Sequence, residues 1–125
     1  MDSNTLLKKQ LLHFFNNVTI RLCIYDWKLV FINNSSEGQC HIREKTIYIG
    51  LCYNNHKELL LHEIAHIGTC RFCNNGHHIA FWKRFEDLMR KFLPNDTISE
   101  SMQNYKLSYK KITYNLNNMY WAEFI

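Results

Sequence analysis

The stretch LLLHEIAHIGTC, residues 59–70, places His62 and His66 on either side of Glu63 in an otherwise apolar segment. Together with the preceding residues HKE, it has the pattern of a buried helix, and Gly68 is placed to end that helix because glycine readily adopts the left-handed C-terminal conformation. On an α-helix, residues four positions apart lie about 40° apart around the axis. His62 and His66 are therefore expected to direct ring nitrogens at one point, with Glu63 beside them.

Two imidazoles and a carboxylate in this arrangement are typical of a zinc site. Imidazole is a common ligand of Zn²⁺, and a catalytic zinc ion keeps one coordination position for water after binding three protein ligands. The pattern H-E-x-x-H on a helix is the zincin signature, in which the glutamate accepts the proton of that water. Burying these polar side chains without such compensation would cost free energy. The sequence thus predicts one catalytic Zn²⁺ held by His62 and His66, with Glu63 as the catalytic base.

Two residues are candidates for the third metal ligand, His77 and Glu86. Glu86 lies 20 residues after His66, an interval found in thermolysin-like enzymes. A helix predicted from His77 to Phe92 carries an apolar stripe that includes His77, whereas Glu86 lies about 180° around the axis from His77. If the stripe faces the motif helix, His77 faces the metal. Helix phase therefore favours His77, and Glu86 stays the rival.

The chain has five cysteines, an odd number, spread through predicted strands and loops. This is not the pattern of a disulfide framework, and it favours a reducing compartment. Cys70 and Cys73 form a C-x-x-C pair shortly before His77 and His78, which resembles half of a structural zinc knuckle. Three interpretations of the pair stay open: plain loop cysteines, a metal or redox role, and a disulfide.

The rest of the chain predicts an N-terminal helix, from Ser3 to Phe15, and a small sheet. Segments rich in β-branched and aromatic residues are typical of strands, and CHIREKTIYIGLC reads as a further hairpin or as one bent strand. The expected strands are Val18–Tyr25, Lys28–Ile32 and the hairpin or bent strand within residues 40–52. We therefore expect an α+β fold in which a small, mostly antiparallel sheet accompanies the N-terminal helix, the H-E-x-x-H helix and a following helix that carries the third ligand.

Length predicts a single domain over residues 1–125, with a core at about 18–92 and a C-terminal extension at 95–125. Hydrophobic residues make up 46% and charged residues 21%, values close to the globular average that argue against disorder. No apolar run approaches the roughly 20 residues that span a bilayer. The sequence therefore predicts a soluble, intracellular protein of the cytoplasm or nucleus that does not bind membranes.

The C-terminal extension alternates tyrosines with lysines, and the formal net charge of the chain is +4. A basic, aromatic segment is able to contact phosphates and stack on bases, so DNA is a candidate partner. The same pattern also fits tyrosines that cover the domain and lysines that face solvent. Both interpretations stay open.

Four motifs follow one another along the chain: Gly38-Gln39-Cys40, the predicted strand Thr46–Gly50, HEIAH at 62–66 and GHHIAFW at 76–82. This order resembles the SprT-like and WLM metallopeptidases, which include the Spartan proteases and small relatives encoded by large DNA viruses. The resemblance implies a minimal zincin-like domain with His62, His66 and His77 as zinc ligands and Glu63 as general base. The chain departs from the family pattern at His78 and in the CRFC loop, and no zinc ribbon of the SprT type follows in residues 95–125.

The resemblance also implies a function, that of a zinc-dependent metalloendopeptidase. Its substrates would include proteins crosslinked to DNA, which would give the protein a role in DNA–protein crosslink repair. The partners would be a protein or peptide substrate and DNA, and a virus-encoded relative would act inside the host cell. We expect the substrate strand to lie along an exposed sheet edge near Thr46–Gly50, bound through main-chain hydrogen bonds. The alternative is a non-catalytic, zinc-stabilised module that binds nucleic acid or protein.

Overall fold

The computed structural model describes residues 3–53, 55–69 and 79–94. The chain divides into two compact units, Met1–Ile64 and Ala65–Ile125. The described residues form helices and a small mixed sheet, which confirms the α+β prediction. No helix within these ranges is long and apolar enough to cross a membrane.

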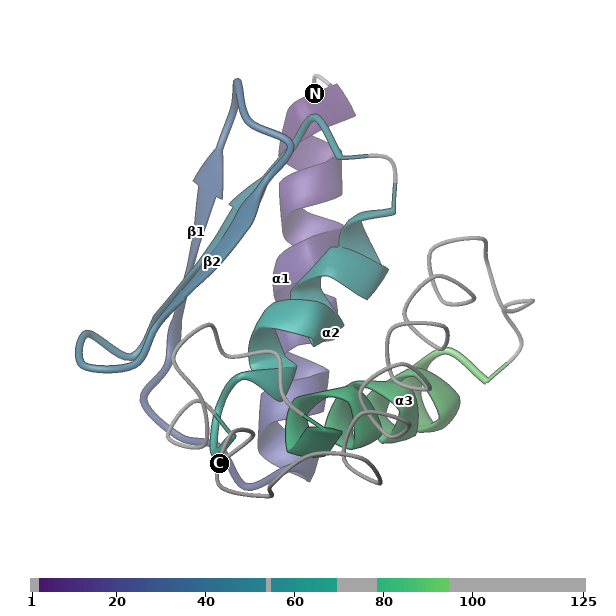
Figure 1. Ribbon diagram of the computed structural model, residues 1–125. Helices are drawn as coiled ribbons and strands as arrows, with labels where there is room; N and C mark the ends of the chain where they lie inside the picture. Colours follow the sequence, from purple (N-terminus) through teal and green to yellow (C-terminus); the bar gives the residue numbers. More distant parts are fainter. Residues whose placement is uncertain (1–2, 54, 70–78, 95–125) are drawn as a thin grey trace. The chain divides into compact units, whose positions relative to one another are not determined.

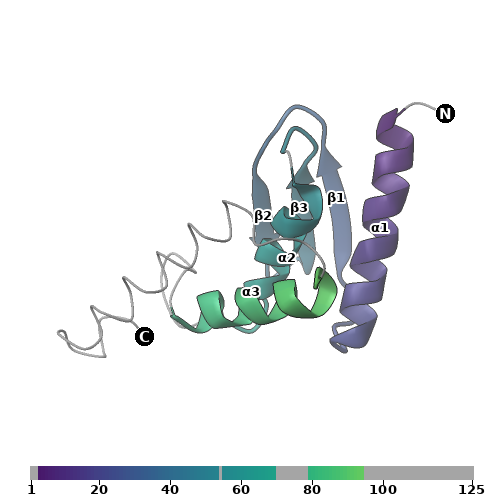
Figure 2. The same ribbon diagram turned by 90° about the vertical axis from the view of Figure 1, so that its right-hand side faces the viewer.

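The first unit begins with helix α1 (Ser3–Arg21) and continues through three short strands into helix α2 (His56–Ala65), whose last residue belongs to the second unit. The strands are β1 (Lys28–Ile32), β2 (Gly38–His41) and β3 (Thr46–Gly50). Figures 1 and 2 show α1 and α2 on the same side of the sheet, with α2 in front of β3 in Figure 2 and α1 beside the edge formed by β1.

The sheet has the order β1-β3-β2 and is mixed, with β1 parallel to β3 and β2 antiparallel to β3. Of the two readings of CHIREKTIYIGLC, a hairpin or one bent strand, the structure shows the hairpin, formed by β2 and β3, whose connection includes Lys45 at a positive φ of 49°. The prediction of a mostly antiparallel sheet is wrong. It required a hairpin partner immediately before β1. The first half of that segment is helical and none of it is a strand, and β1 pairs in parallel with β3 instead.

Helix α1 is longer than predicted. It extends to Arg21 and so includes the first half of the expected strand Val18–Tyr25. Tertiary burial explains the difference, because Leu11, Phe15 and Val18 are spaced at i, i+4 and i+7 and are at most 2% exposed. A continuous helix places all three on one face. β-branched residues favour strands only weakly, so burial overrides the local preference.

The core of the first unit comes from α1, β3 and α2. Ile47 and Ile49 of β3 are at most 1% exposed, which is expected for the central strand of the sheet. On α2, Leu60, Leu61 and Ile64 are completely buried. These apolar contacts fix which side of α2 faces inward, and so determine where the polar side chains of the same helix lie.

The second unit contains helix α3 (Ile79–Phe92). Its apolar stripe is confirmed, because Phe81, Phe85, Leu88 and Met89 are buried. The predicted start of this helix at His77 lies outside the described residues.

Candidate metal centre

The first turn of α2 is fixed by a capping interaction between Asn55 and Glu58. The Asn55 side chain accepts a hydrogen bond from the backbone N–H of Glu58 at 3.4 Å, and its Nδ2 donates to the Glu58 carboxylate at 2.9 Å. Glu58 is only 1% exposed, so these bonds satisfy a carboxylate that would otherwise be costly to bury. The helix therefore starts at a defined residue, which sets the phase of the motif further along.

Hydrogen bonds between neighbouring residues also fix the chain just after the end of α2. Gly68 has a φ of +89°, as predicted for a residue that ends a helix in the left-handed conformation. The Thr69 hydroxyl donates to the Ala65 carbonyl at 2.7 Å, and the Thr69 N–H donates to the His66 carbonyl at 3.2 Å. These bonds satisfy carbonyl groups that the last helical turn leaves without a helical partner.

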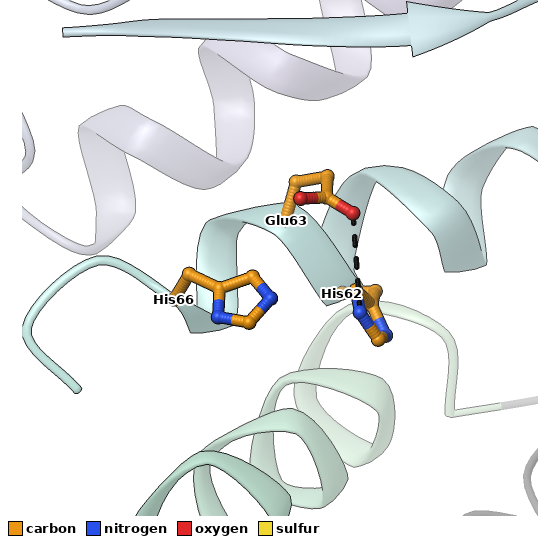
Figure 3. A group of neighbouring side chains, drawn as sticks. All are labelled: His62, Glu63 and His66. Atoms are coloured by element: carbon orange, nitrogen blue, oxygen red, sulfur yellow. Dashed lines mark ion pairs between the residues drawn. The ribbon is translucent and has the colours of Figure 1, made fainter. Parts of the chain in front are cut away.

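The structure brings together three of the predicted site residues, His62, Glu63 and His66. Their ligand atoms all lie within 4.8 Å of one another. His62 Nε2 lies 3.9 Å from a carboxylate oxygen of Glu63, and both side chains are largely buried, with 13% and 7% of their surface exposed. Figure 3 shows His62 and His66 on the same side of α2, one turn apart, with Glu63 beside them.

The Glu63 carboxylate lies against the first residue of β2. A Cβ atom added to Gly38 would lie 2.8 Å from both Cγ and Oε2 of Glu63, closer than real Cβ contacts allow. Any other residue at position 38 would therefore push this carboxylate away. The glycine thus makes room for a buried acid where β2 approaches α2.

Burial raises the pKa of Glu63 to about 7, from an ordinary value of 4.5. Removing a carboxylate from water disfavours its charged form, and this is the cause of the shift. A carboxyl group with a pKa close to neutrality is able both to accept a proton and to release it again. This is the property that a general base needs at physiological pH.

The raised pKa of Glu63 predicts a pH-dependent stability for the metal-free protein. The folded state binds more protons than the unfolded state between pH 4.5 and 7, so stability should fall as pH rises through this window and stay low above it. The shift corresponds to about 3 kcal/mol. In urea unfolding with a metal chelator, the loss of stability between pH 4.5 and pH 8 should be larger in the wild type than in Glu63→Gln, by about this amount.

Glu44 supplies the control for this measurement, because its side chain is 63% exposed. Glu44→Gln should keep the pH dependence of the wild type. If Glu63→Gln keeps it as well, the buried carboxylate is not the group that titrates in this window.

Aromatic stacking orients the second histidine of the motif. The rings of His66 and Phe81 have centroids 4.4 Å apart and planes inclined by 22°, and Phe81 is completely buried. Phe81 in turn contacts Trp82 and Phe85 on α3. A rigid aromatic cluster thus restricts the rotation of the His66 ring, as a metal ligand requires.

The donor set fits a zinc ion by its chemistry. Neutral imidazole nitrogens from His62 and His66 are preferred zinc ligands, and two of them leave coordination positions for a third protein ligand and for water. The Glu63 carboxylate belongs to the same group, so its oxygen is placed either to bind the metal or to act on a water molecule held there. The described residues do not form a closed structural site with four grouped ligands.

The predicted third ligand, His77, lies outside the described residues, as do His78, Cys70 and Cys73. Its rival Glu86 is half-buried on α3, and its carboxylate accepts hydrogen bonds from Arg90 at 2.8 and 3.3 Å. Glu86 is therefore engaged in an ion pair one turn further along its own helix. The choice of His77 stays a prediction.

Sequence reasoning did not assign a role to Gly38 in holding Glu63, or to Phe81 in orienting His66. Neither role has a local signal, because each depends on a contact between separate elements. The Asn55 cap was also not recognised, although the spacing N-x-x-E before an apolar run is a usable signal for it.

No protein-family model matches the chain, and comparisons with curated proteins and with solved structures found no match either.

Proposed function

We propose that the chain is a zinc-dependent metalloendopeptidase with the minimal zincin-like architecture that its motifs resemble in SprT-like and WLM proteins. The observation that supports this most directly is the group His62, Glu63 and His66, at the end of α2 and just beyond it, whose ligand atoms lie within 4.8 Å of one another. The buried position of Glu63 and its raised pKa add the proton acceptor that hydrolysis needs. A metal site with a purely structural role does not need such a base.

In the proposed mechanism His62 and His66 hold the metal, and His77 is the expected third ligand. When bound, zinc supplies Lewis acidity that acidifies water and polarises the scissile carbonyl. Glu63 accepts the proton of the attacking water and then passes it to the leaving amine. Phe81 positions His66, and Gly38 leaves space for the Glu63 carboxylate.

The position expected for the substrate needs a correction. Thr46–Gly50 is β3, which pairs on both sides and is the central strand, so the prediction of an exposed edge there is wrong. The local pattern could not show this, because strand order depends on how distant segments pair. Among the described strands, β2 is an edge, and its Gly38 lies against Glu63. We propose that an extended peptide adds to β2 through main-chain hydrogen bonds, which brings its carbonyl close to the catalytic base.

Hydrolysis of an unfolded protein tests the proposed function. Purified protein loaded with zinc should cleave a reduced, unfolded protein substrate, and a chelator should stop the cleavage. Parallel reactions with single- and double-stranded DNA, and with a protein crosslinked to DNA, test the proposed link to DNA–protein crosslinks. If the protein binds zinc but cleaves no substrate in any of these reactions, the alternative of a zinc-stabilised binding module is favoured.

A further inference from the structure

A cleft of about 500 Å³ lies between α1 and the first turn of α2, within the first unit. Its volume falls within the roughly 300–1,000 Å³ typical of sites for small molecules. The residues that line it are Lys9, Gln10, His13, Phe14, Asn17 and Lys57. None of them belongs to the metal cluster, so the cleft is a separate feature of the molecule.

The charge of the cleft is uniformly basic. Lys9 comes from α1 and Lys57 from α2, and no aspartate or glutamate is among the lining residues. Helix α1 itself has no acidic residue from Ser3 to Arg21. Within the part of the chain that the structure describes, neither lysine forms an ion pair with a carboxylate. Two ammonium groups that share one cleft without a counter-charge favour an anionic ligand.

The lining residues combine this charge with hydrogen-bonding groups and an aromatic surface. Lys57 Nζ lies 5.3 Å from the centroid of the Phe14 ring, which holds the ammonium group at one wall of the cleft. Lys9, His13 and Asn17 are spaced at i, i+4 and i+8 and therefore share one face of α1. Side-chain amides beside fixed positive charges supply donors for the oxygens of an anion.

We propose that this cleft binds a small phosphate-bearing ligand, either a nucleotide or an inorganic polyphosphate. A phosphate group carries up to two negative charges, which two lysines neutralise, and lysine acts as a compact point charge toward phosphate. The amides of Gln10 and Asn17 supply further polar contacts. If the ligand is a nucleotide, Phe14 offers an aromatic ring against which a base packs.

Titration calorimetry on metal-free protein, in the presence of a chelator, tests this proposal with two probes, ATP and tripolyphosphate. Lys9→Met and Lys57→Met should each weaken binding about 10-fold, because each removes a charge-assisted contact while keeping an apolar stem of similar length. Lys8→Met is the matched control. Lys8 neighbours Lys9 on α1 but does not line the cleft, so its replacement should change affinity less than about twofold.

The two probes separate the sources of phosphate. Equal affinity for ATP and tripolyphosphate would identify polyphosphate as the ligand, whereas tighter binding of ATP that Phe14→Leu abolishes would identify a nucleotide. Absence of binding at millimolar concentrations would overturn the proposal. Equal losses in Lys8→Met and Lys9→Met would also overturn it, because they would show general attraction by a basic helix. Since zinc is absent throughout, none of these results bears on the proposed peptidase.

Discussion

Glu63→Gln is expected to lower the rate of peptide hydrolysis by about 10²–10⁴-fold, the usual contribution of a general base. Glutamine has nearly the same shape and fits the space that Gly38 leaves, but it cannot accept a proton from water at neutral pH. The zinc content should stay at the level of the wild type, because the histidines are untouched. Hydrolysis rates on one unfolded substrate, measured beside zinc content by atomic absorption, give both quantities.

Glu44→Gln makes the same chemical change at an exposed position and should leave the rate unchanged. Two results would contradict the assigned role of Glu63. Loss of zinc in Glu63→Gln would make this residue a ligand, and an unchanged rate would require a different base. Because glutamine also removes the unfavourable burial of a charge, the variant should be at least as stable as the wild type above pH 7.

His66→Ala is expected to weaken zinc binding by more than about 100-fold, since even residues that only support a metal ligand commonly contribute 10- to 100-fold. The substitution removes a ring that lies within 4.8 Å of the other donors and that Phe81 holds in place. Competition with a chromogenic chelator measures the affinity. His41→Ala is the control, because its exposed imidazole bonds to Gln39 and lies outside the cluster.

The same assay decides between the two candidates for the third ligand. His77→Ala should weaken zinc binding as strongly as His66→Ala, whereas Glu86→Ala should break the ion pair with Arg90 and leave the zinc affinity close to that of the wild type. The exposed position of that pair limits its contribution to stability. If Glu86→Ala releases the metal and His77→Ala does not, the ligand set inferred from helix phase is wrong. If both variants retain zinc, Cys70 and Cys73 become the next candidates for the remaining ligands.

The sequence by itself determined the features that depend on neighbouring residues. The H-E-x-x-H pattern, the helix that carries most of it and the left-handed turn at Gly68 that follows this helix are predictable from helical spacing and from the conformational freedom of glycine. The strand character of residues 40–50 and the buried stripe of α3 follow in the same way, because alternation and the 3.6-residue repeat are local patterns. Whether the strand residues form a hairpin or one bent strand stayed open in the sequence. The α+β class was predictable from the order of these elements.

Only the tertiary structure decided the features that depend on pairing between distant segments. Burial of Val18 on the face shared with Leu11 and Phe15 extends α1 through a segment whose composition favours a strand. The pairing of β1 with β3 makes the sheet mixed and leaves β2 at an edge.

The surroundings of the site also come from tertiary packing. Gly38 and Phe81 approach Glu63 and His66 from elements remote in sequence, and burial is what raises the pKa of Glu63. The grouping of His62, Glu63 and His66 was thus readable from helical spacing. Their environment was not, because desolvation and packing are properties of the folded chain.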